Sequence, residues 1–157
     1  MPQELPVWRS LLYVPVTVER FVAKAGSRGA DAIILDLEDS IPMPEKARAR
    51  TLVAEAAKVI GASGADVLVR VNRPWRLLVR DLESVVGPDV NGLMLPKIES
   101  AEHLAAIAEI VGELETERGV PAGYTRLVAM LETPGSIFRA EQIARADARL
   151  VGLTVGA

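Results

Sequence analysis

Short apolar runs alternate with amphipathic segments along the chain. The runs show no alternation of apolar and polar residues, which is typical of strands buried on both faces of a parallel sheet. They predict six strands, over Leu11–Val14, Ala32–Leu35, Val67–Val71, Gly92–Leu95, Leu127–Leu131 and Leu150–Val155. Between them, apolar residues recur at the i, i+3, i+4, i+7 spacing of a helix, over 18–25, 49–60 and 104–111. The segment 74–87 is less regular and predicts a loop with a short helix.

Regular alternation of strands and helices defines an α/β fold with a parallel sheet. Two architectures compete, an open doubly wound sheet and a closed eight-stranded barrel. Six strands in 157 residues match the density of a (β/α)₈ TIM barrel, which needs about 250 residues in all. The last predicted strand is followed only by Gly156 and Ala157, and an apolar edge strand needs a cover. We therefore expect residues 1–157 to form a single partial TIM-barrel catalytic domain, supplying about the first six βα units and lacking its C-terminal part.

Composition and charge exclude several classes of function. The formal charge of −3 provides no basic stripe for nucleic acid. No apolar run approaches the roughly 20 residues of a membrane span, and the first residues do not resemble a secretory signal. The sequence contains no cysteine, which excludes disulfides and thiolate metal sites. We expect a cytoplasmic protein that binds neither nucleic acid nor a membrane.

Charged residues gather at the ends of four predicted strands. They are Asp36, Glu38 and Asp39 after the second strand, Arg70 in the third, Lys97 and Glu99 after the fourth, and Glu132 after the fifth. Carboxyl ends of parallel strands lie on one face, which carries the site in barrels and in open sheets. We therefore expect these side chains to converge, although any one of them alone is equally well explained as a helix cap or a solvated loop residue.

The local pattern distinguishes these residues from one another. Asp36 and Glu38 alternate along the extended chain and share one side, whereas Asp39 faces the other side and is the better candidate for a cap or loop contact. Arg70 lies among apolar residues and is expected to point inward. A buried arginine needs an anionic partner, which is either a substrate carboxylate held bidentately or one of Glu38 and Glu132.

Clustered carboxylates without cysteine indicate a hard cation such as Mg²⁺, which prefers oxygen ligands. His103 is the only histidine, and it falls in a predicted helix away from the strand ends, so we expect it on the helix surface. Three basic residues, Lys46, Arg48 and Arg50, are expected to form a solvated helix face.

Five stretches of the sequence resemble the citrate lyase β-subunit family, which includes malyl-coenzyme A lyases and is related to aldolases that cleave hydroxylated keto acids. They are RSLLYVP at 9–15, ADAIILDLEDS at 30–40, VRVN at 69–72, LPKIE at 95–99 and LET at 131–133. The stretches occur in family order and cover nearly the whole chain. One position departs from the pattern: Val16 follows Pro15, where the family usually has a glycine.

The resemblance implies a TIM barrel and a Mg²⁺-dependent carbon–carbon lyase. Such an enzyme cleaves or forms a 3-hydroxy acyl-CoA or related acyl thioester, giving a 2-oxo acid and an acyl thioester. Glu132 then corresponds to a catalytic metal ligand, and an aspartate expected beyond Ala157 to the second ligand. Arg70 corresponds to the catalytic arginine that grips the substrate carboxylate and polarises its carbonyl. Glu38 and Lys97 fall in motifs that line the same substrate-binding pocket.

Other functions remain compatible with the same residues. An aldolase acting on free hydroxylated keto acids would use the same chemistry at the strand ends without a thioester. A non-catalytic truncated scaffold would use the chain for assembly with a partner. In either enzyme the binding partner is a small-molecule substrate, and we expect the barrel to form homo-oligomers.

Overall fold

The computed structural model describes residues 5–155 of the chain. Its parallel strands are β1 Leu11–Pro15, β2 Ala32–Asp36, β3 Asp66–Arg70, β4 Gly92–Leu95, β5 Arg126–Leu131 and β6 Leu150–Val155. The α-helices are α1 Glu19–Ala25, α2 Lys46–Gly61, α3 Trp75–Val85, α4 Ala101–Glu117, α5 Pro134–Phe138 and α6 Ala140–Ala144. Gly156, Ala157 and the expected second metal ligand lie outside the described residues.

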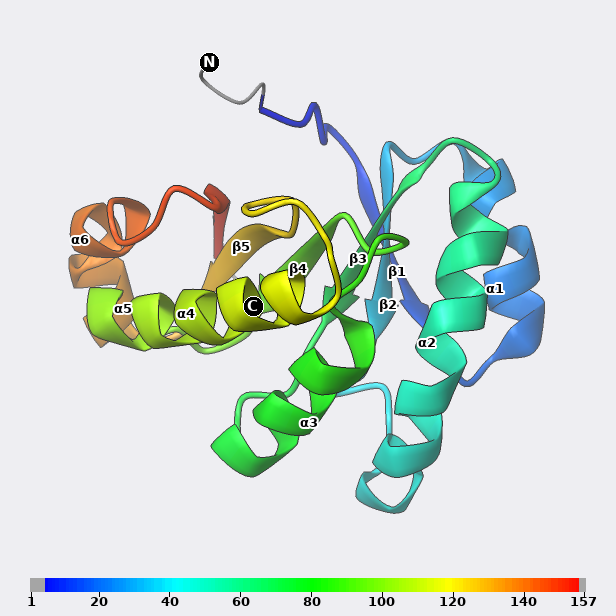
Figure 1. Ribbon diagram of the computed structural model, residues 1–157, viewed down its shortest axis with the longest axis horizontal. Helices are drawn as coiled ribbons and strands as arrows, with labels where there is room; N and C mark the ends of the chain where they lie inside the picture. Colours follow the sequence, from blue (N-terminus) through cyan, green and yellow to red (C-terminus); the bar gives the residue numbers. More distant parts are fainter. Residues whose placement is uncertain (1–4, 156–157) are drawn as a thin grey trace.

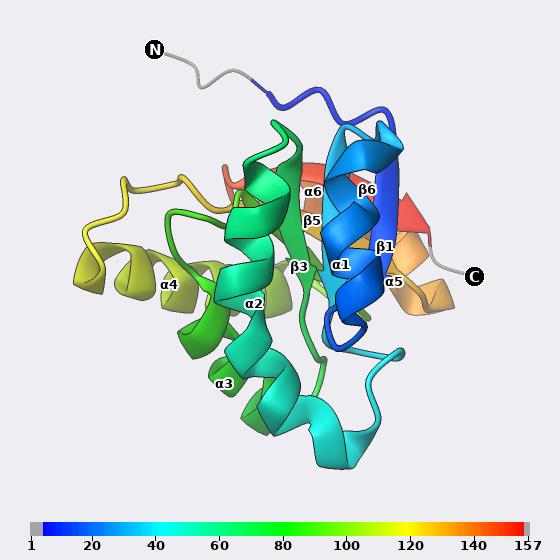
Figure 2. The same ribbon diagram turned by 90° about the vertical axis from the view of Figure 1, so that its right-hand side faces the viewer.

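The order of the strands distinguishes between the two predicted architectures. All neighbouring strands are parallel, and the sheet runs β1-β2-β3-β4-β5-β6 in chain order. A doubly wound sheet reverses its strand order at a switch point, which this sheet never does. The helices lie outside the sheet and follow it as an arc (Figures 1 and 2). The expected fold is thus confirmed as a partial TIM-barrel-like arrangement of β/α units.

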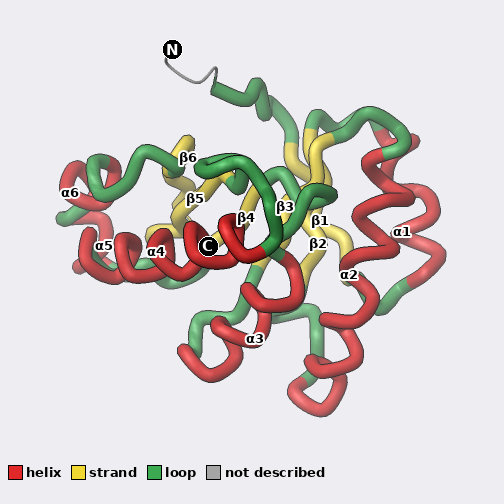
Figure 3. The backbone as a smooth tube through the Cα atoms, in the orientation of Figure 1, coloured by secondary structure: helices red, strands yellow, loops and turns green. Residues whose placement is uncertain are grey.

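Apolar side chains fill both faces of the sheet. The larger cluster joins the outer face to the helices, with residues such as Leu35 and Val69 packed against Val53 and Leu104. The smaller cluster covers the inner face and consists of Ala32, Ile34, Leu68, Met94, Val128 and Met130. Figure 3 shows the strands enclosed by helices on the outer side. All five residues of β2 are buried. Neither face of this strand contacts solvent, which explains why polar and apolar residues do not alternate along it.

The predicted strands are confirmed to within one residue at each end, whereas the helix predicted within 74–87 is longer than expected. This segment contains α3, a helix of 11 residues. Leu78, Leu82 and Val85 are buried at the i, i+4, i+7 spacing of a helix face.

Within residues 5–155, no helix is both long and apolar enough to cross a membrane.

Candidate active site

A continuous chain of charged contacts runs along the carboxyl ends of β2 to β5. Arg70 binds Asp36 and also lies 3.3 Å from Glu38, measured from Nη1 to Oε2. The Nζ of Lys97 donates to Oε1 of Glu38 at 2.6 Å, and its backbone N–H donates to Oε2 of Glu132 at 2.7 Å. The expected convergence is therefore present, and it includes every residue predicted to bind substrate or metal within the chain.

Arg70 forms its principal ion pair with Asp36 and not with Glu38 or Glu132, the two partners that the sequence indicates. The Nε and Nη2 groups of Arg70 donate to the two carboxylate oxygens of Asp36, each at 2.7 Å. Asp36 and Arg70 are opposite each other in the register of β2 and β3. Strand register was the missing signal, because the order of neighbouring strands has to be known before such a pair can be inferred. Glu132 forms no ion pair with Arg70 within residues 5–155.

The environment of Arg70 matches the predicted inward orientation. Its side chain is only 14% exposed, and its guanidinium lies 4.9 Å from the ring centroid of Tyr13, a cation–π contact. Burial acts to lower the pKa of Arg70, but hydrogen bonds to Asp36 outweigh it and raise that pKa above its usual value. Burial likewise acts to raise the pKa of Asp36, and the hydrogen bonds from Arg70 hold it below its usual value.

Glu38 is the buried carboxylate at the centre of the chain of contacts. It is 6% exposed, and burial raises its pKa against the opposing effect of the hydrogen bond from Lys97. Its Oε2 atom is buried without a hydrogen-bond partner among the described residues. Asp39 is exposed, but its carboxylate lies 3.6 Å from the guanidinium of Arg70, which Asp36 and Glu38 also contact. The prediction that Asp39 faces away from these two residues is therefore wrong.

Lys97 has a strained backbone, with a φ of 53°. It is the only non-glycine residue among those the structure describes that has a positive φ, a region that costs free energy for a residue with a side chain. The N–H of Lys97 donates to Glu132, and the next N–H, of Ile98, donates to the backbone of Met130 at 3.2 Å. Strained residues of this kind cluster at functional sites.

Replacing Lys97 allows this strain to be measured. We expect Lys97→Gly to be more stable than Lys97→Ala by about 1 kcal/mol, because both variants lose the contact with Glu38 but only glycine relieves the left-handed conformation. Denaturant unfolding of the two variants of the full-length protein gives the difference. Equal stability of the two would mean that the conformation is not strained.

The oxygen atoms at this edge fit a magnesium ion. One oxygen of Glu132 accepts the Lys97 N–H, which leaves its second oxygen for a ligand. The site also contains Oε2 of Glu38, which has no hydrogen bond among the described residues and whose charge faces Arg70 at 3.3 Å. No cluster of three or more potential ligands occurs within residues 5–155. Mg²⁺ commonly takes one or two carboxylates and completes its shell with water and substrate. A single carboxylate from this part of the chain is compatible with that pattern.

The prediction that Lys46, Arg48 and Arg50 form a solvated helix face is wrong for two of the three. Lys46 is buried, and the side chain of Arg50 is 10% exposed and pairs with Asp81. Asp81, which is fully buried, also accepts the N–H and Nδ2 groups of Asn72 at 2.8 and 2.7 Å. Only Arg48 is exposed as expected. The i, i+4 spacing of Lys46 and Arg50 puts both on the covered side of α2.

Removal of the Asp81 carboxylate should destabilise the fold strongly. We expect Asp81→Ala to lower the free energy of unfolding by about 3–5 kcal/mol, because the buried charge of Arg50 loses its partner. The exposed Asp89 provides a control, whose replacement by alanine should change stability by no more than about 0.5 kcal/mol. Denaturant titration of the full-length variants tests both values. A loss below about 1 kcal/mol for Asp81→Ala would contradict this interpretation.

Two further sequence predictions can be compared with the structure. His103 lies in α4, but it is partly buried and packs against Trp75 in a tilted arrangement, with 5.3 Å between the ring centroids. Its Nε2 atom is buried and has no hydrogen-bond partner among the described residues. It is therefore not a simple surface residue.

Val16 does not have a positive φ and is 3% exposed, so the turn after β1 adopts a conformation that needs no glycine at this position.

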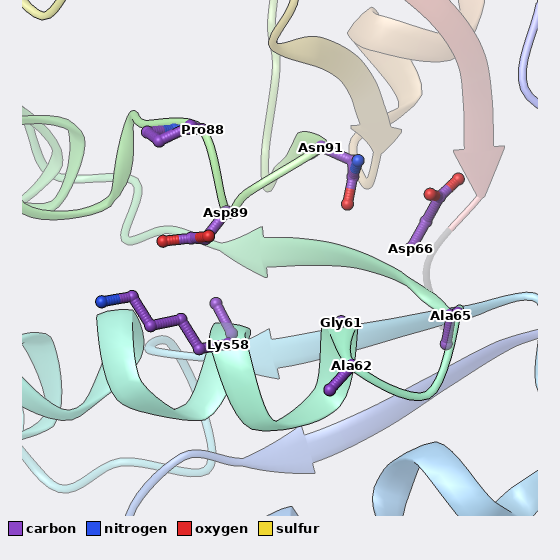
Figure 4. A pocket seen from close by; sticks show the side chains of 10 residues that line it. Lys58, Gly61, Ala62, Ala65, Asp66, Pro88, Asp89 and Asn91 are labelled. Atoms are coloured by element: carbon purple, nitrogen blue, oxygen red, sulfur yellow. The ribbon is translucent and has the colours of Figure 1, made fainter.

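A separate hollow of about 380 Å³ lies at the opposite edge of the sheet (Figure 4). It is lined by Lys58 near the end of α2, by Asp66 at the start of β3, and by Asp89 and Asn91 before β4. Arg70 ends the same strand that Asp66 begins. In TIM-barrel enzymes the amino-terminal edge serves stability and the carboxyl edge carries the chemistry, so we assign the candidate site to the residues around Arg70.

Charged side chains joined along the carboxyl ends of consecutive parallel strands lie where TIM-barrel enzymes carry their active sites. Residues 9–157 match the family model described as HpcH/HpaI aldolase/citrate lyase. The chain belongs to the HpcH/HpaI aldolase/citrate lyase family. This confirms the resemblance inferred from the sequence motifs.

Individual relatives agree with this membership. The chain is 37% identical over 152 residues to the citrate lyase subunit beta of Haemophilus influenzae, covering 95% of this chain and 52% of that protein. It is 33% identical over 159 residues to a (3S)-malyl-CoA thioesterase of Cereibacter sphaeroides, covering 99% and 51%. The chain thus spans about half the length of the curated relatives it matches.

A solved structure gives the same fold. The CitE protein of Mycobacterium tuberculosis, in complex with magnesium, acetoacetate and coenzyme A, superimposes with a TM-score of 0.73 at 29% identity. The match covers 98% of this chain and 50% of that protein.

Proposed function

We propose that the protein containing these residues is a Mg²⁺-dependent carbon–carbon lyase acting on an acyl-CoA or a related acyl thioester. The observation that carries this proposal is the chain of contacts from Asp36 through Arg70, Glu38 and Lys97 to Glu132. It places an arginine beside carboxylates at the edge where barrel enzymes bind substrate. The solved relative complexed with magnesium, acetoacetate and coenzyme A supports the same ligand classes.

Arg70 is suited to hold the carboxylate of a 2-oxo acid. A guanidinium has five N–H donors, and Asp36 uses the Nε donor and one donor of Nη2. Three donors remain, and the ion pair with Asp36 fixes the plane in which they lie. Two of them are on Nη1, which lies 3.3 Å from Glu38 and 3.6 Å from Asp39 without a hydrogen bond to either. Arg70 then orients the substrate and stabilises negative charge that develops on the carbonyl oxygen as the bond breaks or forms.

Glu132 would hold the metal through the oxygen that is not bonded to Lys97, together with an aspartate proposed to lie beyond Ala157. When bound, Mg²⁺ supplies Lewis-acid polarisation of the substrate carbonyl. The N–H of Lys97 keeps the carboxylate of Glu132 in one orientation. A hydrogen bond to a metal-ligating carboxylate fixes the direction in which its free oxygen points.

Glu38 and Lys97 would bind polar groups of the substrate. The Lys97 ammonium is 44% exposed at the side chain, so it is accessible from the solvent side of the site, whereas Glu38 is buried behind it. The Glu38 hydrogen bond raises the pKa of Lys97, which keeps this group cationic and attractive to an anion. We propose that the base for proton transfer comes from outside residues 5–155.

The direct test is an assay of the purified full-length protein with Mg²⁺ and a 3-hydroxy acyl-CoA such as malyl-CoA. The proposal expects a 2-oxo acid and a shorter acyl-CoA as products, with turnover abolished by a chelator and restored by Mg²⁺. The relative named as a thioesterase favours hydrolysis as a second candidate. Release of free CoA without a 2-oxo acid would support hydrolysis and overturn the lyase proposal.

Two other outcomes identify the remaining alternatives. Turnover of free hydroxylated keto acids but not of thioesters would identify an aldolase. An intact mass equal to that of 157 residues, together with a lack of Mg²⁺ binding, would support a non-catalytic scaffold. The homo-oligomeric state and the cytoplasmic location also stay predictions, which light scattering of the purified protein and cell fractionation address.

A further inference from the structure

Lys46, the first residue of α2, is a buried lysine that binds backbone oxygens. It is 8% exposed, and its Nζ donates to the carbonyl oxygen of Leu37 at 2.8 Å and to that of Glu38 at 2.7 Å. Among residues 5–155, no carboxylate forms an ion pair with it. Its ammonium therefore contacts the backbone at the end of β2 and not a charged side chain.

Burial of this charge is costly, so the arrangement needs a physical reason. Burial lowers the pKa of Lys46, while the surrounding charges of Asp81 and Asp36 oppose that effect. An apolar side chain at this position would avoid the desolvation of a charge. What it could not provide is two directed hydrogen bonds to consecutive carbonyl groups, for which a compact ammonium with three donors is suited.

The two carbonyl groups belong to the segment that carries the Glu38 carboxylate. The oxygen of Leu37 also accepts from Nδ2 of Asn72 at 3.0 Å, and the backbone N–H of Glu38 donates to Asp36 at 2.9 Å. Lys46 and Asn72 thus hold the carbonyl side of this peptide segment. The Asp36 carboxylate holds its N–H side, and the backbone at Glu38 is fixed from both directions.

We propose that Lys46 is a positioning residue that holds the Glu38 carboxylate between its two cationic partners at the active site. Those partners are Arg70 at 3.3 Å and Lys97 at 2.6 Å. The kinetic consequence of this inference rests on the proposed function. Its structural consequence, the location of the Glu38 carboxylate, is independent of any activity.

The test replaces Lys46 by methionine in the full-length protein, which keeps most of the aliphatic volume and removes the donors. Lys58→Met is the matched control, because Lys58 is an exposed lysine on the same helix. Lys46→Met is expected to lower kcat/KM about 100-fold, the effect of a displacement of about 1 Å at a reacting centre. A crystal structure of the variant should show the Glu38 carboxylate moved away from Lys97. Lys58→Met should change neither property.

Each outcome decides a separate question. If Glu38 stays in place in the Lys46→Met crystal structure, the positioning role is overturned whatever the activity. If thermal stability falls while kcat/KM of the folded variant equals that of the wild type, Lys46 is merely structural and the proposal again fails. If the wild type lacks lyase activity but Glu38 moves in the variant, the proposed function fails while the positioning role stands.

Discussion

Glu132→Gln is expected to lower Mg²⁺-dependent turnover about 1000-fold, which corresponds to the loss of several kcal/mol of metal-assisted stabilisation of the transition state. In the wild type, Oε2 of Glu132 accepts a hydrogen bond from the Lys97 N–H at 2.7 Å. The amide oxygen of glutamine can accept the same hydrogen bond. Glutamine lacks the negative charge that a hard cation requires. The fold should therefore be unchanged while the metal site is impaired.

The measurement is steady-state turnover of the full-length variant over a range of Mg²⁺ concentrations, together with Mg²⁺ binding by calorimetry. Glu113→Gln, which removes an exposed carboxylate from α4, is the control and should behave as the wild type. Wild-type turnover of Glu132→Gln at saturating Mg²⁺ would exclude Glu132 as a metal ligand. If Glu132→Gln unfolds at the assay temperature, the loss of activity would instead indicate a structural role for Glu132.

The strands and the helices α1, α2 and α4 could be predicted from the sequence because each has a local signature. The run Ala32–Leu35 is apolar throughout since β2 is buried on both faces. The N-cap Thr133 before Pro134 marks the start of α5, and the structure contains the full capping box with Ser136. Such signals depend on residues close in sequence, and the chain contains them without reference to the rest of the fold.

The pairing of residues across strands could not be predicted in the same way. The convergence of Arg70, Lys97 and Glu132 follows from the parallel topology alone, because all carboxyl ends lie at one edge. The bidentate pair of Asp36 and Arg70 depends on register, and a shift of one residue would turn one of the two side chains to the opposite face. The sequence therefore indicates which residues meet at this edge, but it does not indicate their partners.

The burial of Arg50 and Lys46 could not be predicted for a related reason. Both residues lie in a charged stretch of α2, and such a stretch is typical of a solvated helix face. Their partners, Asp81 in α3 and the backbone at the end of β2, are distant in sequence. Charge along one helix says little about which side of it another element covers, and α3 was predicted only as a loop with a short helix.

Arg70→Lys is expected to lower kcat/KM by about 100-fold to 1000-fold, the range found when a donor to a developing oxyanion is removed. Lysine keeps the positive charge but lacks the planar fork that binds Asp36 through two parallel hydrogen bonds. A smaller loss would follow if only charge mattered at this position. Because the side chain is 14% exposed and stacks on Tyr13, solvent cannot replace the missing donors.

The matched control is Arg80→Lys, a replacement at an exposed arginine of α3 that should leave kcat/KM unchanged. Kinetics with a 2-oxo acid substrate, or with an analogue that lacks its carboxylate, separates the two possible roles of Arg70. If Arg70 grips that carboxylate, the wild type should lose activity on the analogue and Arg70→Lys should show little further loss, because both changes remove the same contact. Additive losses would mean that Arg70 acts elsewhere, and its remaining role would be to neutralise Asp36 and Glu38 within the fold.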